Sequence, residues 1–213
     1  VILGGRDLQK GGARGWGIWG VKLDQAMITG NIVAHNVEGS QPIGLNMGQE
    51  MGRTAIRDNI VFNWGHPNVP LSSAVRLGVI SSGFFDFSGN QLVAPRGYAV
   101  LTTLPFDPLV LHTFGSNRYA SGAKPSSWFY LATKALDFLD WAKATNDSSS
   151  VASAPDYEDP YRDICSYAES VGLPATQRAF LDGARLQSKD HWDHRFTADA
   201  VNAYIRAGFR LRS

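Results

Sequence analysis

The segment Ile28-Thr29-Gly30-Asn31-Ile32-Val33-Ala34 recurs, with changes, along the first half of the chain. Each copy has a large apolar residue three positions before an Asn and another two positions after it. The later copies are Ile56-Arg57-Asp58-Asn59-Ile60-Val61-Phe62, Phe87-Ser88-Gly89-Asn90-Gln91-Leu92-Val93 and Phe114-Gly115-Ser116-Asn117-Arg118-Tyr119-Ala120. The Asn residues lie 28, 31 and 27 residues apart. A period of about 20–50 residues is typical of stacked repeats, in which one unit cannot bury its own apolar face.

A second short apolar segment precedes each Asn segment. The four segments cover residues 16–20, 43–48, 74–78 and 98–102. If Ile18, Leu45, Val75 and Val100 are equivalent, they recur at intervals of 27, 30 and 25 residues, in step with the Asn series. Each repeat therefore contains at least two strands, separated by a turn rich in Gly, Pro or polar residues.

Side chains alternate along a strand, which predicts the residues that face the interior. In the Asn segments one inward column is Ile28, Ile56, Phe87 and Phe114, and a second is Val33, Val61, Leu92 and Tyr119. Equivalent residues of successive repeats lie about 4.8 Å apart. We therefore expect the inward amides of Asn31, Asn59, Asn90 and Asn117 to hydrogen-bond to one another along the stack.

The same alternation assigns an outward column to the other strand. If Ile18, Leu45, Val75 and Val100 point inward, then Trp19, Asn46, Arg76 and Leu101 point outward.

These motifs resemble the right-handed parallel β-helix proteins of the pectate-lyase-like superfamily. The resemblance is carried by Gly30-Asn31-Ile32-Val33, Asp58-Asn59-Ile60-Val61 and Gly89-Asn90-Gln91-Leu92 and covers about residues 1–121. It implies the fold and says little about activity, because that superfamily includes lyases, hydrolases, epimerases, phage tailspikes and proteins without catalysis. The expected fold class is an all-β solenoid, a right-handed parallel β-helix with a C-terminal α-helical cap.

The period stops after Asn117, and three parts are expected: β-helix turns over 1–121, a loop, short helix and linker over 122–155, and a helical cap over 156–213. The short helix is predicted over Lys134–Lys143 with Thr133 as its N-cap, and residues 146–155 form a polar linker. Further helices are predicted over 161–173, 175–187 and 197–207. The tail from Asp190 to Phe209 resembles C-terminal segments of secreted bacterial β-helix proteins, and a helical cap would cover an open solenoid end.

Composition excludes some function classes. A net charge of +1 gives no global electrostatic reason to bind nucleic acid or an anionic membrane. No apolar run approaches the roughly 20 residues that span a bilayer. The chain begins with Val1 as though already inside a strand, without a visible signal peptide, so we expect an N-terminal part that was removed or lies upstream. The N-terminal edge could then stack on that part or on another chain.

Outward side chains are where function is expected. A linear groove suits a linear polymer: a Trp offers a platform for a sugar ring, and Arg or Lys engages uronate carboxylates. Trp19, Asn46, Lys22 and Arg53 are the predicted substrate-binding residues. The expected partner is a polysaccharide.

Cleavage of a uronide by β-elimination needs a cation beside the carboxylate, a base for the C5 proton and an acid for the leaving oxygen. The predicted catalytic residues are Arg76 or Arg57 with His66 or His35.

Other chemistry finds little support. The carboxylates are scattered, so no calcium site is predicted, and the outward column holds none of the paired carboxylates of a glycoside hydrolase. His191-Trp192-Asp193-His194 is a weak metal signal, and we expect a helix-entry loop with Trp192 packed on the cap. No cofactor is predicted, because no phosphate-binding Gly loop or nucleophile elbow is present.

The resulting hypothesis is a protein that is secreted, periplasmic or at the cell surface and that binds an acidic polysaccharide; whether it also cleaves this polymer by β-elimination is left open. The alternative is a non-catalytic surface or assembly protein that stacks on another chain or on a missing N-terminal half.

Overall fold

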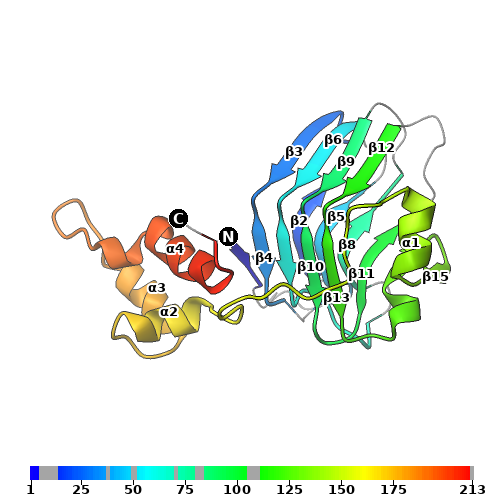
Figure 1. Ribbon diagram of the computed structural model, residues 1–213. Helices are drawn as coiled ribbons and strands as arrows, with labels where there is room; N and C mark the ends of the chain where they lie inside the picture. Colours follow the sequence, from blue (N-terminus) through cyan, green and yellow to red (C-terminus); the bar gives the residue numbers. More distant parts are fainter. Residues whose placement is uncertain are drawn as a thin grey trace. The chain divides into compact units, whose positions relative to one another are not determined.

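A computed structural model of the protein describes residues 1–4, 14–36, 39–48, 52–69, 72–79, 84–104 and 111–211. It is a parallel β-solenoid of about four turns with a few helices near the C-terminus. Figure 1 shows strands of successive turns lying side by side, such as β3, β6, β9 and β12. The predicted fold class is confirmed.

The solenoid has three sheets. The five-stranded sheet runs in the order β1 (Ile2–Leu3), β4 (Ile32–Ala34), β7 (Ile60–Phe62), β10 (Gln91–Ala94) and β13 (Arg118–Ser121). The four-stranded sheet contains β3 (Gln25–Thr29), β6 (Arg53–Arg57), β9 (Phe84–Ser88) and β12 (Leu111–Gly115). The six-stranded sheet contains β2 (Trp16–Gly20), β5 (Ile43–Met47), β8 (Ser73–Leu77), β11 (Ala99–Thr103), β14 (Phe129–Leu131) and β15 (Lys134–Leu136). All paired strands are parallel except β14 and β15.

Both predicted inward columns exist. The strand register places Ile28, Ile56, Phe87 and Phe114 beside one another on the four-stranded sheet. On the five-stranded sheet it aligns Val33, Val61, Leu92 and Tyr119. Most of these side chains are fully buried in one core cluster, because apolar side chains of every turn meet inside the coil.

The Asn residues form the predicted ladder. The Oδ1 atom of Asn59 accepts hydrogen bonds from the backbone N and the Nδ2 of Asn31, both at 3.0 Å. Asn90 receives the same two bonds from Asn59, and Asn117 receives them from Asn90. The second Nδ2 donor of Asn90 goes to the carbonyl of Ile56, so this buried amide uses both donors inside the protein.

The residue before each ladder Asn has a positive φ angle. Gly30 and Gly89 have φ of 64° and 67°, and Asp58 and Ser116 have 53° and 56°. This left-handed conformation turns the chain from the four-stranded sheet into the five-stranded sheet. The chain thus presents each Asn to the interior at the corner between two sheets.

Residues 146–155, predicted as a linker, extend the ladder. The backbone N of Asn117 donates to the Oγ of Ser150 at 2.8 Å, and Val151 pairs in parallel with Arg118. Asp147 Oδ1 accepts from the backbone N of Ser150 and so fixes this turn. The sequence pattern missed this rung because a hydroxyl replaces the amide and the interval is 33 residues.

The end of the solenoid is covered by a hairpin and a helix. Residues Lys134–Leu136 form β15 rather than the predicted helix, and helix α1 runs from Phe138 to Thr145 with Asp137 as its N-cap. Trp141 on α1 is fully buried and stacks on Phe129, with ring centroids 4.9 Å apart. The prediction of Thr133 as N-cap was wrong because Asp137, with a backbone N–H three residues later as its partner, begins the helix instead.

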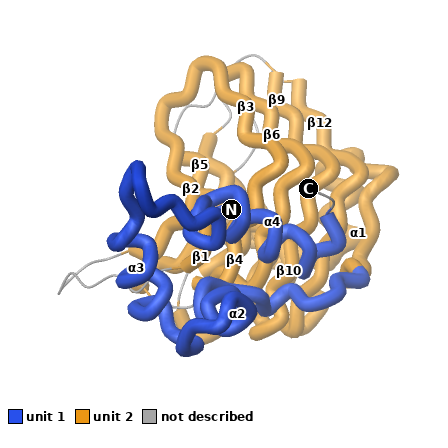
Figure 2. Tube along the Cα trace, turned by 90° about the vertical axis from the view of Figure 1, so that its left-hand side faces the viewer, with its two compact units in different colours: residues 1, 156–213 blue, residues 2–155 orange. Residues whose placement is uncertain are grey.

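The chain divides into two compact units, residues 2–155 and residue 1 with 156–213 (Figure 2). The second unit contains α2 (Ile164–Ser170), α3 (Gln177–Arg185) and α4 (Ala198–Gly208), so the three helices predicted there exist with shifted ends. A short 3₁₀ turn, η2 (His194–Phe196), precedes α4, and another, η1 (Pro125–Ser127), precedes β14. Tyr167, Ala168 and Phe180 form the buried centre of the helical unit.

Replacing Asn90 with Ala should strongly destabilise the solenoid. The backbone N and the Nδ2 of Asn59 would lose their buried acceptor, and such unsatisfied groups cost about 1–3 kcal/mol each. We expect the free energy of unfolding to fall by about 2–4 kcal/mol. Urea unfolding followed by circular dichroism measures this loss.

Asn31→Ala is the matched control, because Asn31 is the first ladder residue and is only partly buried. Its amide donates to Asn59 and is not the acceptor for another ladder residue among the described residues. We expect a loss below about 1 kcal/mol. An equal loss in both variants would contradict a ladder that depends on buried acceptors.

Candidate functional site

The outer face of the six-stranded sheet carries one column of side chains in register. Trp19 lies beside Asn46, and Asn46 lies beside Arg76. The column continues to Thr102 and Tyr130 on the next two strands. Leu101 was predicted to point outward, but it pairs with Val75 and is fully buried. The prediction was wrong by one residue because Leu101, not Val100, is equivalent to Val75.

Strands β8 and β11 bend at their second residue, where their pairing omits Ala74 and Val100, and this explains the error. Ala74 and Val75 are consecutive, yet both are fully buried, which strict alternation in a straight strand does not allow. The same is true of Val100 and Leu101. Both residues at the bend therefore face the core, and the alternation restarts after it.

The outward side chains on either side of the bend approach one another. The ring centroids of Trp16 and Trp19 are 4.9 Å apart, although the residues are three positions apart in one strand. Ser73 Oγ lies 3.3 Å from Thr102 Oγ1 on the neighbouring strand. The outer face is therefore concave along the bend.

A cavity of about 500 Å³ opens on this face over β8, β11 and β14. Polar side chains of Ser72, Arg76, Thr102, Ser127 and Tyr130 line it, together with His66 and apolar residues such as Leu77. The volume is within the range of small-ligand sites. None of the described residues that line the cavity is an Asp or Glu.

Arg76 is the only Arg or Lys among the described residues that line the cavity. It is half-buried, and the described part of the chain contains no carboxylate partner for it. A guanidinium that lacks a carboxylate partner among the described residues favours an anionic ligand, because it can donate two parallel hydrogen bonds to a carboxylate.

His66 lies in the turn after β7 and reaches the same cavity. Its backbone N donates to Ser72 Oγ at 2.7 Å, and its Nδ1 accepts from the backbone N of Asn68 at 3.1 Å. The neutral ring therefore carries its proton on Nε2. The structure brings together Arg76 and His66, two of the four predicted catalytic residues.

Arg57 lies on a different sheet and already has a partner. It is the last residue of β6 in the four-stranded sheet, and its guanidinium forms an ion pair with Asp86 of β9. Asp86 is 7% exposed, so this pair neutralises a nearly buried carboxylate. Arg57 therefore lies outside the cavity and is paired within the protein, so of the two alternatives Arg76 is the one that lines the cavity.

The remaining predicted residues lie outside the cavity. His35 follows β4 with φ of 68° and contacts the ring of Phe62 edge-on. Arg53 is exposed on the four-stranded sheet, and Lys22 lies in the turn after β2. Asn46 is 6% exposed, whereas Trp19 is 60% exposed. Of the predicted substrate-binding residues, Trp19 and Asn46 therefore share the column of Arg76, and Trp19 offers the exposed ring.

Tyr130 and Thr102 were missed by the sequence argument. Tyr130 lies 28 residues after Thr102, an interval typical of the repeats, so continuing the outward register by one strand could have found it. Tyr130 lines the cavity, and its hydroxyl has no hydrogen-bond partner among the described residues.

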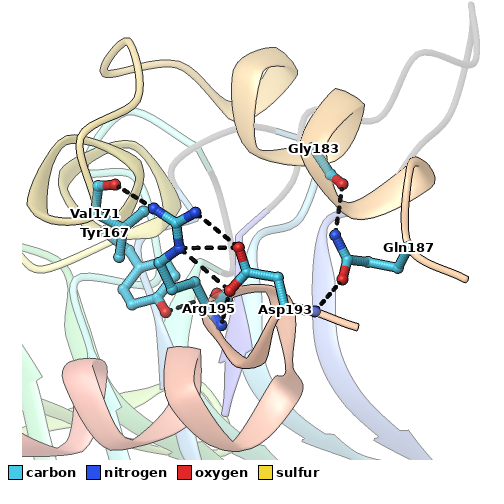
Figure 3. A network of polar contacts seen from close by, with 6 residues as sticks. All are labelled: Tyr167, Val171, Gly183, Gln187, Asp193 and Arg195. Carbon is cyan, nitrogen blue, oxygen red and sulfur yellow. Dashed lines mark hydrogen bonds and ion pairs between the residues drawn. The ribbon is translucent and has the colours of Figure 1, made fainter. Parts of the chain in front are cut away.

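The His191–His194 segment was considered as a metal signal in the sequence. Across the described ranges, no group of three or more His, Cys, Asp or Glu residues could hold a metal ion. Asp193 caps η2 and binds Arg195 instead (Figure 3). Trp192 was predicted to pack on the helical unit, but it is 69% exposed, which corrects that prediction.

The chain matches no protein-family model, and no curated protein or solved structure is significantly similar to it. The parallel solenoid is therefore shown by the structure, and no family match supports the resemblance to the pectate-lyase-like superfamily. None of the described helices has the length and apolar character needed to cross a membrane.

Arg57→Ala should lower stability and leave ligand binding unchanged. Loss of the guanidinium leaves the Asp86 carboxylate nearly buried without its cation, and we expect a loss of about 1–2 kcal/mol in the free energy of unfolding. Arg53→Ala on the same strand is the control and should change stability by less than about 0.5 kcal/mol. Chemical denaturation of both variants measures the two free energies of unfolding. Equal values for Arg57→Ala and Arg53→Ala would refute a structural role for Arg57.

Proposed function

We propose that the protein binds an acidic polysaccharide on the outer face of the six-stranded sheet. The observation that carries the proposal is Arg76, which has no ion-pair partner among the described residues and lines a cavity of about 500 Å³ with no described carboxylate in its lining. A uronate residue has a carboxylate for the guanidinium and hydroxyls for the Ser, Thr and Tyr side chains around it.

The column gives the proposed site a direction. Strands lie about 4.8 Å apart, so Trp19, Asn46, Arg76, Thr102 and Tyr130 follow a line across five strands. A linear polymer can contact Arg76 in the cavity and the exposed ring of Trp19 further along. Acidic polysaccharides of this kind occur outside cells, so the proposal includes a location that is secreted, periplasmic or at the cell surface.

Arg76→Ala should weaken binding of pectate or alginate at least tenfold, because a charge-assisted bond to a carboxylate contributes about 1.5–3 kcal/mol. Wild-type binding should also weaken as salt rises. Affinity electrophoresis in gels containing the polymer measures both effects. Arg53→Ala, which removes an exposed cation outside the cavity, is the control; equal weakening in both variants would mean nonspecific attraction.

A second candidate function is β-elimination in the same cavity, favoured by His66 and Tyr130 lining it with Arg76. The C5–H and C4–O bonds break, a C4=C5 double bond forms, and a proton goes to the leaving oxygen. Arg76 stabilises the charge that develops on the carboxylate. The ionised oxygen of Tyr130 accepts the C5 proton and then donates it to the leaving oxygen, while the Nε2–H of His66 donates a hydrogen bond to that oxygen.

The cleavage candidate has its own test. Incubation with pectate, alginate and glycosaminoglycans should raise the ultraviolet absorbance of the unsaturated product. Tyr130→Phe should reduce the rate at least 100-fold while binding is retained, because general acid–base catalysis contributes about 10²–10⁴-fold. If the wild type binds a polymer without any change in absorbance, the protein binds the polysaccharide without cleaving it, and the lyase hypothesis is rejected.

A further inference from the structure

Trp16 and Trp19 of β2 form an aromatic pair at one end of the six-stranded sheet. Their ring centroids are 4.9 Å apart, and the ring planes are tilted by 45°. Trp16 is partly buried, whereas Trp19 is 60% exposed. The pairing of β2 with β5 omits Gly17, which faces the core, where a Cβ atom would clash with Val33. Strand β2 therefore bends as β8 and β11 do, and both rings lie on the concave outer face.

A cation completes this cluster. The Cζ atom of Arg14 lies 4.8 Å from the centroid of the Trp16 ring. Arg14 is exposed, and the described residues supply no carboxylate partner for it. The N–H groups of a guanidinium lie in its plane, so they stay available to a ligand while one face of the group stacks on a ring. Arg14, Trp16 and Trp19 thus combine a sugar-stacking surface with a donor for a carboxylate.

The backbone that carries the cluster is held in place by its neighbours. The carbonyl of Gly15 accepts hydrogen bonds from Trp64 Nε1 at 2.9 Å and from Asn36 Nδ2 at 3.0 Å, and both of these side chains are buried. The carbonyl of Arg14 accepts from the backbone N of Gln41 at 3.1 Å. Because this backbone is ordered before a ligand arrives, less conformational entropy is lost on binding.

The cluster lies two strands away from Arg76. Strands β2, β5 and β8 lie side by side (Figure 1), and Trp19, Asn46 and Arg76 occupy equivalent positions on them. Neighbouring strands are about 4.8 Å apart, so the rows of Trp19 and Arg76 are separated by roughly 10 Å. An extended pyranose chain advances per sugar by a length similar to one strand spacing. A sugar at Arg76 and a sugar at Trp19 are therefore the first and third of three consecutive units.

We propose that Arg14, Trp16 and Trp19 form a second uronate-binding subsite, which takes the third sugar of a chain whose first sugar is bound by Arg76. The inference rests on the proposed function, because Arg76 sets the position of the first sugar. The C–H face of the third sugar stacks on the exposed ring of Trp19, and Arg14 donates hydrogen bonds to its carboxylate. The occupant follows from continuity with the groove, since a cation without a described carboxylate partner lies at each end of this row.

Oligogalacturonates and oligomannuronates of two and three units test the proposal on the full chain by isothermal titration calorimetry. For at least one series, affinity should rise at least tenfold from the dimer to the trimer, because only the trimer reaches both cations. Trp19→Ala and Arg14→Ala should each weaken trimer binding about tenfold and leave dimer binding unchanged. Arg76→Ala should weaken the binding of both lengths.

The controls are matched to the two side chains. Met27→Ala removes an exposed apolar side chain on β3, and Arg53→Ala removes an exposed cation on β6, both on the four-stranded sheet. Neither change should alter the binding of dimer or trimer. Trp19→Phe should retain part of the trimer binding, because a smaller ring still stacks. Since Trp19 and Arg14 are exposed, their variants should keep the wild-type thermal midpoint.

The two proposals fail in different ways. Equal affinity for dimer and trimer would overturn the second subsite, as would trimer binding that is unchanged in Trp19→Ala and Arg14→Ala, while a loss in Arg76→Ala would still support the groove. If no oligomer binds, or if Arg76→Ala binds both lengths as the wild type does, the groove proposal itself is refuted and the second subsite with it.

Discussion

The amide-to-amide hydrogen bond between successive turns is the interaction on which the solenoid depends. Asn59 and Asn90 each accept two hydrogen bonds from the turn before and donate two to the turn after, and both amides are fully buried. A buried amide without such partners would destabilise the fold, so the ladder allows only one register. That register in turn decides which side chains of every other strand face outward.

The groove follows from this register together with the bend of the six-stranded sheet. Two consecutive buried residues, such as Ala74 and Val75, turn the strand and bring outward side chains of neighbouring strands together. Arg76 lies just after the bend and lines the cavity together with His66, which is in the turn before β8. The cation and the cavity therefore have a common origin in the strand geometry. Arg57 lies on a sheet where the adjacent strand supplies Asp86, so its charge is used within the protein.

Much of the fold could be predicted because the repeated Asn and apolar residues have the same structural role in every turn. The Asn ladder, both inward columns and the parallel sheets follow from alternation and a common period. The position of Leu101 could not be predicted, since a bend that places two neighbours inside leaves no mark in an alternating pattern. The turn at Ser150 could not be predicted because a Ser hydroxyl replaces the Asn amide as the hydrogen-bond acceptor there. Arg76 was found by its outward register, whereas Tyr130 required the repeat to be continued past the point where its apolar pattern fades.

The unequal intervals of the ladder have a consequence for how such a chain can change. Successive ladder residues are separated by 27 to 33 residues, yet the rungs stay in contact. The loops between ladder residues differ in length, whereas the spacing between successive rungs stays the same. Insertions or deletions of a few residues between rungs are therefore compatible with an intact core, because closing a somewhat longer loop costs little entropy. The surface around the groove can then diversify by loop length while the scaffold beneath it stays constant.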